Sequence, residues 1–219
     1  NPGNYDVTAG VGTQSNDTVN ALRHAWADAG SRNSDTYLDH MLTITNAATA
    51  NASSFHLAAL VDTSNYFTVR LALDTTGQIL MSTGKREAGA LLIFTGPTTV
   101  GTGHVGGDWW TTRLQVWGTQ IRAKAWLRTT PEPVDWMQTF TDDTNVIQGT
   151  NVGAASRLEA GNTNGLPVVF NYDNLRALDP CAGLETIETC SDDLVAPSSG
   201  EFRLGDPMRP CNDVTLQLT

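Results

Sequence analysis

The sequence WWTTRLQVWGTQIRAKAWL, residues Trp109–Leu127, decides the fold of this chain. Apolar residues recur at every second position on both sides of the dipeptide Gly118-Thr119. This alternation is typical of two half-buried strands, and a two-residue loop that begins with glycine favours a type II′ turn. The stretch therefore predicts a β-hairpin in which Trp117 lies opposite Gln120 and Leu114 lies opposite Ala123.

The two faces of this hairpin differ in character. The predicted inward face is apolar and consists of Leu114, Val116, Ile121, Ala123, Ala125 and Leu127. The predicted outward face mixes basic and aromatic residues and consists of Arg113, Gln115, Trp117, Arg122, Lys124 and Trp126. Arg113 and Lys124 fall directly opposite each other. Like charges in that position cost stability unless acids from neighbouring strands or from a partner offset them.

Two interpretations of the outward face remain open at this point. Flat indole rings can stack on other flat surfaces, sugar rings among them. A glycan- or partner-binding surface would then consist of Arg113, Trp117, Arg122, Lys124 and Trp126. Alternatively, the face is solvated, Trp126 packs over the aliphatic parts of Arg122 and Lys124, and Trp110 and Trp136 belong to the core.

Strand signals continue along most of the chain. Ten candidate strands are separated by turn residues, and convincing amphipathic helices are absent from the pattern. This spacing is typical of a β-sandwich or jelly roll. The candidates are residues 21–27, 37–45, 55–62, 66–74, 78–83, 90–95, 110–117, 120–127, 152–157 and 168–175.

Length and charge narrow the possible functions. The 219 residues carry a formal net charge of −10, of which residues 179–219 contribute −6. This balance argues against nucleic acid as a partner, because binding to phosphates needs a basic surface. No apolar run approaches the 18 residues that a membrane-spanning helix needs, so we expect no membrane insertion.

A change in composition after Leu178 predicts a domain boundary. Residues 1–178 are expected to form the jelly-roll domain, and residues 179–219 an acidic, proline-containing linker or the start of a further domain. We expect that segment to dock on a partner chain or to lead into another domain. It holds every cysteine of the chain, Cys181, Cys190 and Cys211. They could form a disulfide, bind a metal or remain free thiols.

The sequence contains no motif for catalysis. Sandwich-fold glycosidases need carboxylates two or four residues apart along one strand, and we find no Glu-x-Asp-x-Glu or similar run. No Gly-x-Ser-x-Gly elbow occurs either. The glycines Gly101, Gly103 and Gly106 match a dinucleotide fingerprint, but a strand follows them instead of the required helix. The chain is therefore expected not to be an enzyme.

Metal sites have weak support in the sequence. His24, His40 and His56 lack acidic or thiol neighbours at ligand spacing, so we expect hydrogen-bonded or surface histidines. Asp173 near the end of the last candidate strand could bind calcium, although capping a turn is the commoner role. No other cofactor is expected.

Several motifs in order resemble one family of domains. They are Ala59–Asp62, Asn65–Leu71, Trp110-x-x-x-Leu114, Gly118–Trp126, Glu132-Pro133-x-x-Trp136, Phe170–Leu175 and Phe202–Asp213. Their order resembles the concanavalin A-like lectin/glucanase (laminin G-like) jelly-roll domains of minor tail proteins in phages that infect actinobacteria. The carboxylates of the glucanases are missing from this chain.

The resemblance implies a concanavalin A-like jelly-roll β-sandwich in a phage minor tail protein. It implies a non-catalytic structural or receptor-binding module on the virion tail, outside the cell, which takes part in host attachment and possesses affinity for host cell-surface polysaccharide. Other tail proteins and further copies of the same chain are the implied partners. The alternative is a carbohydrate-binding module of a secreted bacterial glycoside hydrolase.

Overall fold

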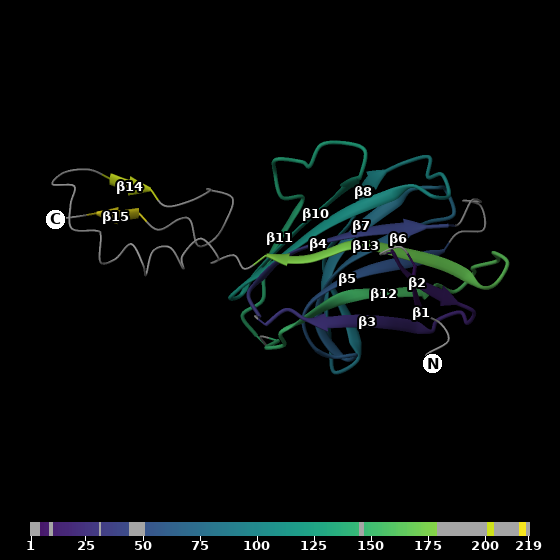
Figure 1. Cartoon of the computed structure of the whole chain (residues 1–219), viewed down its shortest axis with the longest axis horizontal. Helices are drawn as coiled ribbons and strands as arrows, with labels where there is room; N and C mark the ends of the chain where they lie inside the picture. The colour runs from purple at the N-terminus through teal and green to yellow at the C-terminus, as the bar shows by residue number, and fades with distance from the viewer. Residues whose placement is uncertain are drawn as a thin grey trace. The chain divides into compact units, whose positions relative to one another are not determined.

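The computed structural model describes residues 5–8, 11–30, 32–43, 51–144, 147–178, 201–203 and 215–217. The chain divides into two units, Asn1–Ala177 and Leu178–Thr219. The first unit is a sandwich of two antiparallel β-sheets (Figure 1). In the described part of the chain, no helix is long and apolar enough to cross a membrane.

One sheet has seven strands and the other has six. The seven-stranded sheet consists, in spatial order, of β1 (Tyr5–Thr8), β2 (Val11–Asn16), β13 (Val168–Leu178), β4 (Ser34–Leu42), β9 (Trp109–Trp117), β10 (Gln120–Leu127) and β11 (Gln138–Thr141). The six-stranded sheet consists of β3 (Leu22–Asp28), β12 (Asn151–Leu158), β5 (Ala52–Asp62), β6 (Asn65–Leu73), β7 (Ile79–Glu87) and β8 (Ala90–Gly101). In the second unit, β14 (Glu201–Arg203) pairs with β15 (Thr215–Gln217).

Each predicted strand has a counterpart in the sandwich, and three further strands were not predicted. These are β1, β2 and β11. Strand β2 gave no signal because polar residues occupy inward positions: Gln14 and Asn16 are buried, and both hydrogen-bond to Ser156 of β12. A strand that packs through hydrogen bonds lacks the apolar alternation on which the prediction depends.

The predicted hairpin is confirmed in its register. Trp117 pairs with Gln120, Leu114 pairs with Ala123, and Lys124 pairs with Arg113. Gly118 has a φ of 54°, the left-handed conformation that the first loop position of a type II′ turn requires. The inward side chains lie in the main core with those of β6, and are fully buried: Leu114, Val116, Ile121, Ala123 and Ala125.

A hydrogen-bonded pair of histidines lies between the two sheets. His40 contacts Ser54 Oγ at 2.7 Å and Thr112 Oγ1 at 2.8 Å, and His56 contacts the same Thr112 Oγ1 at 2.9 Å. Both imidazoles are completely buried. Burial lowers the pKa of His56 to about 3 and the pKa of His40 well below its ordinary value. The prediction of hydrogen-bonded histidines is confirmed for these two, which are neutral.

The glycine motif at the end of β8 serves packing. Gly101 lies directly against the buried indole of Trp110, and a Cβ atom at this position would collide with that ring. Strand β9 follows the motif, so no helix N-terminus is available to hold a phosphate.

Candidate functional site

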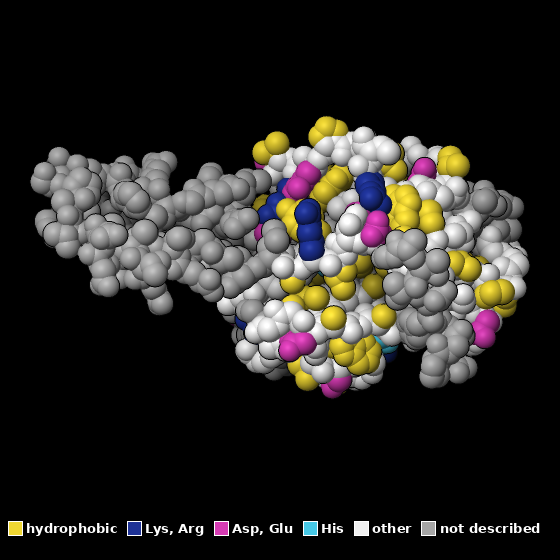
Figure 2. Space-filling view, in the orientation of Figure 1, with side chains coloured by type: hydrophobic (Ala, Val, Ile, Leu, Met, Phe, Trp, Pro, Cys, Tyr) yellow, Lys and Arg dark blue, Asp and Glu magenta, His cyan; other side chains and the backbone are white. Residues whose placement is uncertain are grey.

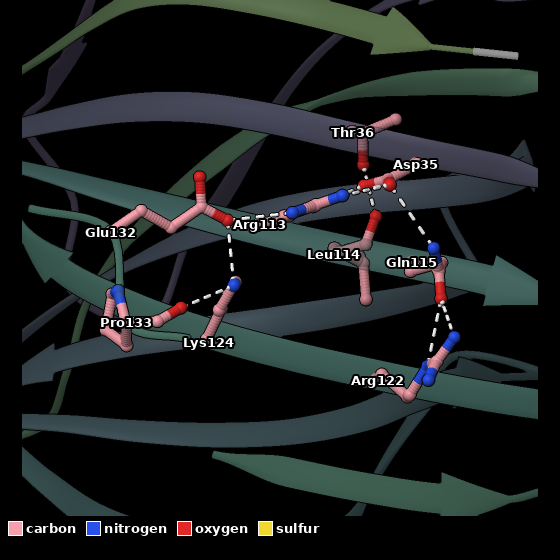
Figure 3. Close-up of polar contacts among 9 residues, drawn as sticks. All are labelled: Asp35, Thr36, Arg113, Leu114, Gln115, Arg122, Lys124, Glu132 and Pro133. Atoms are coloured by element: carbon pink, nitrogen blue, oxygen red, sulfur yellow. Dashed lines mark hydrogen bonds and ion pairs between the residues drawn. The ribbon is translucent and has the colours of Figure 1, made fainter. Parts of the chain in front are cut away.

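The segment 128–137, which connects β10 to β11, folds over the outward face of β4, β9 and β10. Figure 3 shows Glu132 and Pro133 of this segment in contact with Arg113 and Lys124 on the two hairpin strands. The candidate surface predicted from the hairpin is therefore partly covered by the chain itself. We refer to this arrangement as the covered face.

Ion pairs offset the two facing cations of the hairpin. Arg113 binds Asp35 of β4 through two hydrogen bonds of 2.8 and 2.6 Å, and its Nη1 donates to Glu132 Oε1 at 2.8 Å. Lys124 Nζ lies 2.8 Å from the same Glu132 oxygen and donates to the carbonyl of Pro133 at 2.6 Å. The acidic side chains predicted to offset these two cations therefore come from the neighbouring strand β4 and from the segment 128–137 (Figure 3).

These contacts shift the pKa values of both partners in the directions expected for ion pairs. Burial alone would lower the pKa of the Arg113 guanidinium, but the hydrogen bonds and charge of Asp35 raise it above its ordinary value. Burial alone would raise the pKa of the Glu132 carboxyl, but hydrogen bonds from Lys124 and Arg113 lower it. Glu132 is therefore ionised at neutral pH.

An aromatic and cationic stack completes the covered face. The ring of Trp136 lies 5.1 Å from the Arg113 guanidinium and 5.0 Å from Lys124 Nζ, and it also contacts Arg122 at 5.2 Å. The sequence placed Trp126 over Arg122 and Lys124, and Trp136 in the core. The structure corrects that alternative, because Trp136 covers the cations while Trp126 lies edge-on to Tyr37 at 6.5 Å.

The five predicted surface residues differ in accessibility. Arg113 and Lys124 are only 7% and 1% exposed, so neither can reach a ligand while the segment 128–137 is in place. Trp117, Arg122 and Trp126 are partly exposed. Of these, Arg122 donates two hydrogen bonds to Gln115 Oε1.

We expect Glu132→Gln to lower the free energy of unfolding by about 1.5–3 kcal/mol, because the change removes the charge that Arg113 and Lys124 share. The matched control is Asp135→Asn in the same segment. Asp135 is exposed, and its change should stay within about 0.5 kcal/mol. Urea denaturation at pH 7 measures both. Equal effects of the two substitutions would contradict a stabilising role for Glu132.

Asp173, the candidate calcium ligand, is paired with an arginine. Its carboxylate lies 3.2 Å from Arg128 Nη1, and Arg128 Nε lies 3.3 Å from Asp39, which also accepts a hydrogen bond from Asn174. Among the residues that the structure describes, no three acids, histidines or cysteines cluster as metal ligands. A cation at Asp173 would have to displace the Arg128 guanidinium. Cys181, Cys190 and Cys211 lie outside the described residues.

Trp26 on β3 is a candidate that the sequence analysis did not single out. It is 48% exposed, the only aromatic residue among the large exposed hydrophobics of the described part of the chain. Its ring lies edge-on to His24 at 6.4 Å, and the neighbouring strand accommodates it with Gly153, where a Cβ atom would come within 2.8 Å of Trp26 Cα. The alternation of Leu22, His24 and Trp26 marked a strand, but alternation cannot show which face stays open.

A cavity of about 730 Å³ lies between the sheets beside β3. Small residues from both sheets line it, among them Gly12, Ala25, Ala27 and Ala154, together with Leu38 and Tyr172. Asp173 and Asn174 supply polar groups at its wall. Figure 2 looks onto this side of the sandwich, where hydrophobic side chains gather between β13 and β3.

The sequence matches no protein-family model and no curated protein. Solved structures share the fold. The carbohydrate binding module CBM66 from Bacillus subtilis superposes with a TM-score of 0.53 at 10% identity, over 80% of this chain and 91% of that one. The β-glucanase of Bacillus licheniformis superposes with a TM-score of 0.51 at 13% identity, over 81% of this chain and 83% of that one.

A third similar structure is xylan β-1,4-xylosidase from Bacillus halodurans C-125. Its TM-score is 0.53 at 10% identity, and the match covers 77% of this chain but only 33% of that enzyme. At such identities the likeness concerns the fold. The predicted all-β, jelly-roll-like β-sandwich is confirmed as the fold class.

Proposed function

We propose that this chain is a non-catalytic carbohydrate-binding module. The observation that carries the proposal is Trp26, a half-exposed indole on the edge strand β3. An exposed ring held by His24 and accommodated by Gly153 offers a flat apolar surface to the C–H face of a sugar. The sandwich also shares its fold with a carbohydrate binding module. Trp117, Arg122 and Trp126, at the accessible parts of the covered face, form the second candidate surface.

The proposal of a non-catalytic role is supported by the state of the carboxylates on the seven-stranded sheet. A glycosidase needs one carboxylic acid to donate a proton and one free carboxylate to act as base or nucleophile. Asp35, Asp39, Glu132 and Asp173 each pair with an arginine or a lysine. Each of these carboxylates is thus engaged by a cation, and for Glu132 the hydrogen bonds from Lys124 and Arg113 lower the pKa of the carboxyl.

We also propose the kind of protein to which the module belongs. The ordered sequence motifs support a minor tail protein of an actinobacteria-infecting phage, in which the module would sit on the virion tail beside other tail proteins and bind host cell-surface polysaccharide. The alternative setting is a secreted bacterial glycoside hydrolase. A binding assay that compares two kinds of ligand distinguishes the alternatives. Binding to purified polysaccharide from actinobacterial cell walls favours the phage protein, and binding to xylan or β-glucan favours the hydrolase.

We expect Trp26→Ala to weaken glycan binding by about 2- to 12-fold. This range corresponds to the loss of one ring contact, for which aromatic pairs give about 0.5–1.5 kcal/mol. Binding of the fluorescently labelled chain to a glycan array and to the purified polysaccharides measures the effect. Val61→Ala is the matched control, because Val61 is an exposed apolar residue with 52% of its surface accessible.

The double variant Trp117→Ala/Trp126→Ala tests the second surface in the same assay. Loss of binding in this variant, with Trp26→Ala unchanged, would move the site to the covered face. Absence of binding by the unaltered chain to every glycan would refute the proposed function. Circular dichroism spectra confirm that each variant is folded.

A further inference from the structure

The cavity of about 730 Å³ beside β3 has the size of a ligand site. Small-molecule sites usually measure about 300–1,000 Å³. Its walls are mostly apolar, and three alanines among them leave room for a ligand: Ala25 and Ala27 of β3, and Ala154 of β12. Trp26, on which the proposed function depends, belongs to the same lining. A sugar stacked on Trp26 would therefore lie next to this cavity.

Several polar side chains in the wall of the cavity are bound to other parts of the protein. Thr13 Oγ1 donates a hydrogen bond to Asn171 Oδ1 at 3.0 Å, and Asn174 Nδ2 donates one to Asp39 Oδ2 at 2.8 Å. The carboxylate of Asp173 faces an arginine at 3.2 Å. A ligand rich in hydroxyl groups would bury several of them in this cavity without partners, which costs free energy.

Gln14 of β2 is the lining residue with a buried polar atom that lacks a partner. It is 2% exposed, and its Nε2 has no hydrogen-bond partner among the described residues. A buried donor without an acceptor is destabilising. The cavity therefore favours a ligand that brings one acceptor atom to Gln14 and presents apolar carbon elsewhere.

A chain of hydrogen bonds fixes which atom of the Gln14 amide is free. Arg23 Nε donates to Asn16 Oδ1 at 3.3 Å, and Asn16 Nδ2 donates to Ser156 Oγ at 2.8 Å. The hydroxyl of Ser156 then donates to Gln14 Oε1 at 2.8 Å. Because each member has its orientation set by the one before it, the amide oxygen of Gln14 faces Ser156 and the amide nitrogen is left to donate.

We propose that the cavity binds the acyl group of an acylated saccharide. The carbonyl oxygen of the acyl group would accept a hydrogen bond from Gln14 Nε2, while its alkyl chain packs against the three alanines and the sugar ring stacks on Trp26. An acyl group combines one acceptor with an apolar chain, and the wall of the cavity offers the matching combination. This inference rests on the proposed carbohydrate binding and specifies the class of saccharide.

The experiment compares four neutral monosaccharides that differ only in the substituent at carbon 2. They are glucose, N-acetylglucosamine, N-butanoylglucosamine and N-hexanoylglucosamine, and isothermal titration calorimetry with the full chain measures their affinities. We expect the affinity to rise about threefold to fourfold for each added methylene, the gain that its burial provides. Glucose, which lacks the acyl group, should bind most weakly.

Two variants locate the acyl group. Ala27→Leu narrows the cavity at an exposed alanine and should abolish the gain from acetyl to hexanoyl, whereas Ala90→Leu, at an exposed alanine of β8, should preserve it. Gln14→Leu removes the free donor and should weaken binding of the three acyl sugars by about 2- to 12-fold, without an effect on glucose. Circular dichroism spectra show whether Gln14→Leu folds; if it does not, the result for Ala27→Leu decides.

The outcomes separate this inference from the proposed function. The inference is overturned if N-hexanoylglucosamine binds no more tightly than N-acetylglucosamine, if the gain persists in Ala27→Leu, or if folded Gln14→Leu binds the acyl sugars like the unaltered chain. Binding to a polysaccharide that depends on Trp26, without a preference within the monosaccharide series, would leave the proposed function intact. Absence of binding to every glycan would refute both.

Discussion

Replacing Asp35 with alanine is expected to lower the free energy of unfolding by about 3–5 kcal/mol. Asp35 is 1% exposed and holds the guanidinium of Arg113, itself 7% exposed, through two hydrogen bonds. Removal of the acid leaves a buried cation with only the shared Glu132 as its acidic partner. A loss of this size is a large part of the 5–15 kcal/mol that stabilises a typical domain.

Urea denaturation at pH 7, followed by tryptophan fluorescence, measures this effect. The control is Asp17→Ala, which breaks the pair with Arg23 at a distance of 2.9 Å, where the Asp17 side chain is 58% exposed. Exposed pairs contribute about 0–1 kcal/mol, so the two variants should differ severalfold. A similar, small loss in both would mean that the segment 128–137 does not exclude water from Arg113.

Acidification from pH 7 to pH 5 is expected to lower the free energy of unfolding by about 4 kcal/mol through His40 and His56 alone. The unfolded chain binds protons at both imidazoles near pH 6.5. The folded chain does not, because burial lowers the pKa of His56 to about 3 and that of His40 well below its ordinary value. The stabilisation is therefore complete above about pH 6.5 and is lost as the pH falls towards the folded values.

Denaturation curves at half-unit steps between pH 7.5 and pH 5 measure the slope, which is about 1.4 kcal/mol per pH unit for each histidine well below pH 6.5. His24 adds to the slope, since burial and the charge of Arg86 lower its pKa to about 4. In His56→Gln, which keeps a polar group beside Thr112, the slope should decrease by the contribution of one histidine. An unchanged slope would show that His56 titrates in the folded protein as it does in the unfolded chain.

The hairpin at 109–127 could be predicted in detail because its information is local. A two-residue loop fixes the register of its strands, and the register then decides which side chains share a face. The opposition of Arg113 and Lys124 followed directly, and so did the need for acids to offset them. Apolar alternation also predicted the ten main strands, but not β2, whose inward Gln14 and Asn16 are polar.

The identity of the offsetting acids depended on contacts between distant parts of the chain. Asp35 reaches Arg113 because β4 lies beside β9, a pairing across 78 residues. Glu132 reaches Arg113 because the segment 128–137 folds back over the sheet. The sequence of this segment has no apolar periodicity, so it does not indicate the path that the segment takes. The same limit concealed Trp26, because the alternation along β3 does not show which parts of the fold leave its face uncovered.

The pairing of β2 with β13 has a consequence for synthesis of the chain. These strands are neighbours in the seven-stranded sheet although β2 ends at Asn16 and β13 begins at Val168. At about 5–20 residues per second, β2 waits roughly 8 to 30 seconds on the ribosome before its neighbour is synthesised. Since non-local pairing is slow, the sandwich closes only near the end of translation. We expect chains that stop before β13 to aggregate through open strand edges, and to be substrates for chaperones.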